Sequence, residues 1–252
     1  MSIISLTERL RLERGLLEVM LGGFDELTFN TWEWLKTSEA QEMFYEQNTL
    51  FTTFFRSSGI NDVWQDIIDA RASKGVDVTQ SIYEYARQVN MEDHLVPYTA
   101  TETAALNRLC DYNYELIRNV TIDEVTAIRR QLVQDFANGT YPMQTTLKEL
   151  QLQPINGWSP QQRAQVIART ETARTWNVST LETFRNDGVE MVVLYGCDSS
   201  CDVCGEYFSP IPIDEAMSVG VPHPNCTGVW VSAENAPEPP LPGEAWSEPS
   251  YD

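Results

Sequence analysis

The sequence from Cys201 to Cys226, CDVCGEYFSPIPIDEAMSVGVPHPNC, decides how the C-terminal part of this chain folds. It opens with Cys201-Asp-Val-Cys204 and closes with His223-Pro-Asn-Cys226, with 18 residues between the two pairs. Two thiolates three positions apart can turn back onto one metal ion, and a His-x-x-Cys pair completes a tetrahedron. Closed sets of four ligands are typical of structural zinc, so the pattern predicts a Zn²⁺ site with three sulfur ligands and one nitrogen ligand.

Other interpretations of these cysteines stay open at this point. Cys197, four positions before Cys201, is a candidate substitute for one of the four ligands. The alternatives to a metal are free buried thiols and a Cys201–Cys204 disulfide. The chain has five Cys, and an odd count argues against a disulfide framework. The fifth, Cys110, lies among leucines on a predicted helix, so we expect it to be a small buried apolar residue.

A catalytic zinc is not expected from this sequence. Such a site needs an open coordination position and a nearby general acid or base. The zinc deaminases carry a His-x-Glu signature ahead of their Cys-x-x-Cys, and neither His94 nor His223 begins that pattern. We expect His94 to lie in a surface loop. The chain is therefore predicted not to be an enzyme.

On either side of the cysteines the sequence is strand-like. Val189–Tyr195 and Thr227–Val231 are rich in β-branched and apolar residues, and they predict two paired strands. Ahead of them, Ser159-Pro-Gln-Gln162 combines an N-cap residue, a proline at the first helical position and a glutamine three residues after the cap. This pattern predicts a long helix that stops at Gly188.

Helical periodicity dominates the chain before Ser159. Three capping-box patterns, in which Ser or Thr and Glu satisfy free N–H groups, predict helix starts. They begin at Ser5, Thr99 and Thr121. Gly22-Gly23 and Gly139 predict helix ends, and Gly75 separates two further predicted helices. The other expected helices cover residues 29–55 (one or two helices), 61–72, 78–89 and about 145–150.

These patterns predict a mainly α fold. A multi-helix body is followed by a small α+β zinc-knuckle module with a two-stranded sheet, and then by an extended acidic tail. In chain order we expect an N-terminal helical region (1–95), a second helical part (96–187), the strands and Cys/His module (188–232) and the acidic, Pro-rich tail (233–252).

The chain is strongly acidic, with 17 Lys and Arg against 37 Asp and Glu and a net charge of −20. Residues 191–252 contain no Lys or Arg, which makes direct DNA binding by this part of the chain unexpected. Nothing approaches 18 consecutive apolar residues, so no membrane-spanning segment or membrane partner is expected.

The tail from Ala233 onward has five Pro and five acidic residues. This composition cannot bury a core, so we expect it to be extended and to lie along protein rather than DNA. Trp246, Tyr251 and Leu241 are apolar enough to anchor it in a groove. A disordered, solubilising tail is the alternative.

The predicted helix before Gly188 contains Arg169-Thr-Glu171 and Arg174. Taken alone, such a charged set is most often a solvated face. Its order in the chain, ahead of a short strand and the two Cys/His pairs, resembles the phage Mu F-like minor head proteins, also called head morphogenesis proteins of tailed phages. The resemblance runs from about Thr99 to Val231. Thr227 departs from it, because family members usually carry Arg-Cys after the last knuckle.

The resemblance implies a structural minor capsid protein that assists head assembly, DNA packaging or DNA exit. Its implied partners are the portal protein, the major capsid or scaffold protein and, indirectly, packaged DNA. Its implied location is the virion, at the portal vertex, with the host cytoplasm as the place of assembly. Two other functions stay open: a zinc-containing nuclease acting on phage DNA, and a cellular zinc-bound adaptor.

In such a structural protein, the charged residues on the long helix need a role. We expect Arg169 and Glu171 to fasten this helix to the Cys/His module through charge-assisted hydrogen bonds. Arg174 lies three positions after Glu171, so the two side chains can pair on one helix face.

Overall fold

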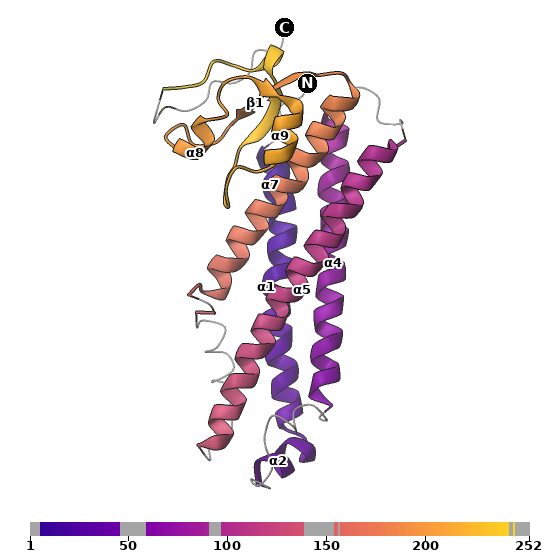
Figure 1. Ribbon diagram of the computed structural model, residues 1–252. Coiled ribbons are helices and arrows are strands. Elements are labelled where there is room, and N and C mark those ends of the chain that lie inside the picture. Colours follow the sequence, from indigo (N-terminus) through magenta and orange to yellow (C-terminus); the bar gives the residue numbers. More distant parts are fainter. Residues whose placement is uncertain are drawn as a thin grey trace. The chain divides into compact units, whose positions relative to one another are not determined.

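The structure is a computed structural model that describes residues 6–45, 59–90, 97–138, 154–155, 157–241 and 244. Its long helices are α1 (Leu6–Leu35), α4 (Ile60–Asn90), α5 (Ala100–Ala137) and α7 (Pro160–Asn186) (Figure 1). The shorter elements are α2 (Ser38–Tyr45), β1 (Met191–Tyr195), α8 (Asp202–Gly205), β2 (Ile211–Pro212), α9 (Ile213–Val219), β3 (Val229–Ser232) and the 3₁₀ turn η1 (Ala233–Asn235). The predicted class, a mainly α chain with a small α+β module near its C-terminal end, is confirmed.

The sheet has three antiparallel strands in the order β2-β1-β3, where two strands were predicted. β1 places Leu194 opposite Trp230 of β3, and Val192 opposite Ile211 of β2. Strands β1 and β3 fall where the β-branched runs predicted them. β2 has two residues, one of them a proline, so it is too short to show an alternating pattern in the sequence.

Two of the predicted helix starts and one stop are confirmed in atomic detail. The Thr99 N–H donates to Glu102 Oε2 (2.7 Å), and the Glu102 N–H donates back to Thr99 Oγ1 (3.2 Å). Likewise, the Gln162 N–H donates to Ser159 Oγ (3.2 Å) at the start of α7. After α7, Gly188 adopts a φ of 78°, the left-handed conformation that ends a helix at little cost to glycine.

The helix ends predicted at Gly22-Gly23 and Gly75 are wrong, because these glycines lie inside the continuous helices α1 and α4. A Cβ atom at Gly23 would overlap the Arg71 side chain, and a Cβ atom at Gly75 would overlap Ile117. Both glycines therefore allow a neighbouring side chain to approach the helix backbone closely.

The helix start predicted at Thr121 is also wrong, because α5 runs through it. Thr121 Oγ1 donates to the carbonyl of Ile117 (2.8 Å) and accepts from Arg71 Nη1 (3.0 Å). Glu124, the other residue of the supposed capping box, forms a buried ion pair with Arg71. Burial raises the pKa of Glu124, and the Arg71 guanidinium opposes this shift. Thr121 and Glu124 therefore bind the buried Arg71 side chain and do not cap a helix.

The chain divides into two compact units. The first comprises Met1–Leu16, Val76–Asn113 and Val166–Asp252, and the second comprises Leu17–Gly75 and Tyr114–Gln165. The second unit has a core around Leu27, Trp64 and Ile128. The first unit packs Phe184 of α7 with Leu194 and Trp230 of the sheet. All the predicted metal ligands belong to the first unit.

Several predicted features lie outside the described residues: Ser5, His94, Gly139, the helix at about 145–150, Trp246 and Tyr251. In the tail, Leu241 is 68% exposed, so it is not buried in a groove of this chain. Cys110 is buried, as predicted. Among the described helices, none has the length and apolar character needed to span a membrane.

The two neighbouring glycines of α1 provide a matched test of helix packing. We expect Gly22→Ala to raise the free energy of unfolding by about 0.5–1 kcal/mol, because the helix gains propensity and no atom lies within 4 Å of the new methyl group. Gly23→Ala should lower it by about 1–3 kcal/mol, because the methyl group overlaps the hydrogen-bonded Arg71 side chain. Urea unfolding of both variants measures the difference. Equal effects would contradict the role assigned to Gly23.

Candidate metal centre

Two short segments of the first unit bring the predicted ligands together. Cys201 is the N-cap residue of α8 and Cys204 lies within that helix, while His223 and Cys226 lie in the loop between α9 and β3. Figure 1 shows α9 and β1 beside the C-terminal half of α7, and Cys204 of α8 belongs to the same apolar core as Phe184 of α7. Between Cys204 and His223 the chain forms β2 and α9, and these two elements return it to the first Cys pair.

The ligand atoms of Cys201, Cys204 and His223 all lie within 4.8 Å of one another. His223 Nε2 is 3.3 Å from Cys201 Sγ and 3.1 Å from Cys204 Sγ. Cys226 joins this group through Cys204, with 3.6 Å between the two sulfur atoms. All the cysteines are free thiols, so the Cys201–Cys204 disulfide is not formed.

These separations fit one tetrahedral metal ion. Zn–S bonds of about 2.3 Å and Zn–N bonds of about 2.0 Å place tetrahedral ligands about 3.8 Å apart for two sulfurs and about 3.5 Å apart for sulfur and nitrogen. The Cys204–Cys226 distance of 3.6 Å and the His223–Cys201 distance of 3.3 Å are close to these values. Cys201, Cys204 and His223 could therefore hold a metal ion, and Cys226, which lies beside Cys204 but outside this group of three, would have to approach them to complete the set.

Hydrogen bonds orient two of the ligands. His223 Nδ1 lies 2.8 Å from the carbonyl of Pro224. Because a carbonyl can only accept, the ring proton is on Nδ1, and Nε2 keeps a free lone pair that faces the sulfurs. The Gly228 N–H donates to Cys226 Sγ (3.3 Å), which helps to fix the position of this sulfur.

Burial shapes the electrostatics of the cluster. It raises the pKa of Cys204 above the ordinary value of a thiol, and it raises the pKa of Cys197 to about 11. Cys197, Cys204 and Cys226 all belong to the apolar core of the first unit. A thiolate in such surroundings needs a compensating positive charge, and a bound divalent cation supplies one.

Asn177 of α7 fixes the ends of the loop that carries His223 and Cys226. Its Nδ2 donates to the carbonyls of Gly220 (3.3 Å) and Gly228 (3.2 Å), and its Oδ1 accepts from the Trp230 N–H (3.4 Å). Asn177 is fully buried, so its amide cannot bind water and forms its hydrogen bonds with these backbone groups instead. No role could be assigned to Asn177 from the sequence, because its partners lie more than 40 positions away along the chain.

The charged residues of α7 are divided between two places. Arg169 Nη1 donates to Asn225 Oδ1 (3.1 Å), and Asn225 is the residue before Cys226. Glu171 forms its ion pair with Arg174 on the same helix (2.9 Å), and the Arg174 guanidinium lies 5.3 Å from the centre of the Tyr112 ring. Burial raises the pKa of Glu171, and Arg174 opposes this shift. The structure therefore brings Arg169 to the Cys/His loop, whereas the ion pair of Glu171 lies on α7.

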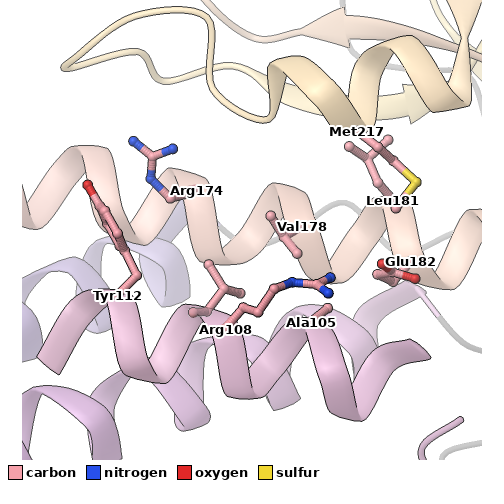
Figure 2. A pocket seen from close by; sticks show the side chains of 9 residues that line it. Ala105, Arg108, Tyr112, Arg174, Val178, Leu181, Glu182 and Met217 are labelled. Atoms are coloured by element: carbon pink, nitrogen blue, oxygen red, sulfur yellow. The ribbon is translucent and has the colours of Figure 1, made fainter. Parts of the chain in front are cut away.

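A pocket of about 320 Å³ lies between α5 and α7 (Figure 2). Figure 2 shows Arg174 beside Tyr112 at one end, and Met217 of α9 at the edge. Glu182 in the lining is paired with Arg185, as Arg174 is with Glu171. The nine lining residues include no Ser, Cys, His or Asp.

Two cations from distant parts of the sequence reach the Cys/His loop. Arg9 of α1 donates to the carbonyl of Thr227 (2.6 Å), and Arg169 of α7 contacts Asn225. Residues 191–252 contain no Lys or Arg, so the composition of this segment does not indicate that Arg9 and Arg169 contact it. Arg9 could not be predicted from the sequence, because a single arginine on a charged helix carries no signal of its tertiary contact.

No known protein family, curated protein sequence or solved structure matches this chain. The likeness to phage head proteins therefore rests on the ordered motifs alone.

The cluster gives a direct prediction for metal content. We expect protein purified without chelators to hold one zinc ion per chain, and Cys204→Ser to lose it, because Cys204 lies closest to both His223 and Cys226. Cys110→Ala is the matched control, since it removes a buried thiol outside the cluster. Elemental analysis checks both variants. Less than about 0.2 zinc ions per chain in the wild type, with all thiols freely reactive, would contradict the predicted zinc site.

Zinc content also tests whether Cys197 is a metal ligand. We expect Cys197→Ala to keep its zinc, because the predicted ligands Cys201, Cys204, His223 and Cys226 supply four donors without it. Loss of zinc in Cys197→Ala together with retention in Cys226→Ala would make Cys197 the fourth ligand.

Proposed function

We propose that this protein is a structural minor head protein of a tailed phage, and that one zinc ion holds its C-terminal module together. The main support for the proposal is the cluster of Cys201, Cys204 and His223, with Cys226 beside Cys204, at the end of an ordered set of motifs. The set includes Arg169-Thr-Glu171 and Asn177 on α7, followed by the sheet and the two Cys/His pairs.

The surroundings of the cluster favour a structural role for the metal. Cys204 and Cys226 are buried in the core of the first unit, between the sheet and α7. A metal bound there would join the α8 segment to the loop before β3, and structural zinc sites stabilise small modules in this way. The proposed ion would therefore act by holding the chain together.

The neighbouring cations do not favour a nuclease. Arg9 and Arg169 both lie near the cluster, but each is already engaged. Arg9 donates to the carbonyl of Thr227, and Arg169 contacts Glu13 and Asn225. A metal-dependent DNA cleavage assay tests this alternative, and specific cleavage that is lost in Cys204→Ser would favour it.

The proposed partners are the portal protein and, in the prohead, the major capsid or scaffold protein. Exposed apolar side chains are available for such contacts, among them Phe29 of α1 (58% exposed) and Trp158 before α7 (52% exposed). The acidic C-terminal part would keep away from packaged DNA, so contact with DNA is proposed to be indirect. The proposed location is the portal vertex of the virion, after assembly in the host cytoplasm.

Co-expression with the portal protein of the same phage tests the proposed function. We expect the two proteins to elute as one complex, because a portal-associated head protein must present a surface to the portal. Phe29→Asp should weaken the complex, whereas the charge-matched substitution Asn30→Asp, one position along α1, serves as the control. Separate elution at micromolar concentration and low salt would contradict portal association. Absence of the protein from purified virions, measured by mass spectrometry, would favour a cellular adaptor.

A further inference from the structure

The first turns of α1 contact the loop that carries two of the metal ligands. Arg9 Nη1 donates to the carbonyl of Thr227 at 2.6 Å. Thr227 follows Cys226 directly, so this bond holds the backbone on the C-terminal side of a ligand. Both residues belong to the first unit.

A second link runs from the same helix face. Glu13, four residues after Arg9, lies 3.3 Å from Arg169 Nε, and Arg169 Nη1 donates to Asn225 Oδ1 (3.1 Å). The Asn225 N–H also donates to Thr170 Oγ1 (2.9 Å). Asn225 precedes Cys226, so the two links hold the backbone on both sides of this ligand.

The conformation of Asn225 needs such support. Its φ is 68°, which makes it the one residue other than glycine with a left-handed backbone in the described part of the chain. Side-chain and backbone hydrogen bonds from α7 offset the cost of this conformation. The turn at Asn225 directs Cys226 toward Cys204, 3.6 Å away.

Apolar packing and opposite charge also favour the contact between α1 and the loop that carries Cys226. Leu12, between Arg9 and Glu13 on α1, is buried in a cluster with Trp176 and Val229. A zinc ion with three thiolates and a neutral imidazole carries one net negative charge, and the Arg9 guanidinium has the opposite sign. Burial lowers the pKa of Arg9, while the nearby negative charges of Glu13 and Cys226 oppose this shift.

We propose that residues 6–16 of α1 are a positioning element of the metal site: Arg9 directly, and Glu13 through Arg169, hold residues 225–227 so that Cys226 faces the metal. Metal binding and docking of this helix segment then stabilise each other by the same free energy, because coupling between two sites is reciprocal. This inference rests on the proposed zinc site.

The direct test compares three variants of the full chain. Arg9→Gln removes the charge and the hydrogen bond, Arg9→Lys keeps the charge, and Arg14→Gln removes one charge from an exposed position of the same helix. Zinc affinity is measured by competition with a chromophoric chelator. We expect Arg9→Gln to bind zinc roughly 10- to 100-fold more weakly, as for other residues that orient metal ligands. Arg9→Lys should recover part of the loss, and Arg14→Gln should bind like the wild type.

Hydrogen exchange supplies a second readout that a general loss of stability would not reproduce. Zinc should slow exchange of residues 6–16 in the wild type and in Arg14→Gln, and this effect should shrink in Arg9→Gln. If Arg9→Gln does not fold, Glu13→Gln tests the second link in the same way.

The outcomes separate the two proposals. A wild-type protein that binds no zinc would overturn the zinc site itself. A wild type that binds one zinc ion, with equal affinity in Arg9→Gln and no change in exchange of residues 6–16, would overturn the coupling and leave the zinc site standing.

Discussion

The geometry of the candidate metal centre depends on the buried amide of Asn177. α7 carries this residue into the interior of the first unit, where an unpaired amide would be costly. Its partners are the carbonyls of Gly220 and Gly228 and the N–H of Trp230, which lie on either side of the segment that contains His223 and Cys226. One side chain therefore fixes where this loop begins and where β3 starts. The positions of His223 and Cys226 within the loop depend on these two fixed ends.

The same loop is held again at its tip. Arg169 and Thr170, two turns before Asn177 on α7, bind Asn225, and Arg9 of α1 binds Thr227. The loop thus receives polar contacts from two helices that are far apart in sequence. A proposed zinc ion would add the third attachment, to α8 through Cys201 and Cys204.

The sequence predicted those features whose cause is local. The caps at Thr99 and Ser159 and the stop at Gly188 follow from hydrogen bonds and backbone preferences within a few residues, and they are confirmed. Strands β1 and β3 followed from β-branched runs, and the Cys/His cluster followed from ligand spacing. Whether the cluster holds zinc stays a prediction.

The features that the sequence did not show depend on contacts between distant segments. Gly23 and Gly75 read as helix ends, but the deciding factor is a side chain from elsewhere in the chain that occupies the space of a missing Cβ atom. Thr121 and Glu124 matched a capping box, yet a buried Arg71 uses both of them. Arg9 gave no signal at all, because its partner is a backbone carbonyl more than 200 positions away.

X-ray absorption at the zinc edge is the sharpest test of the proposed ligand set, because it reports the kinds of ligand and their distances without a crystal. We expect three sulfur neighbours at about 2.3 Å and one nitrogen neighbour at about 2.0 Å, with the scattering pattern of an imidazole. A shell dominated by oxygen and nitrogen, or a fourth sulfur in place of the imidazole, would contradict the proposed ligand set of Cys201, Cys204, His223 and Cys226.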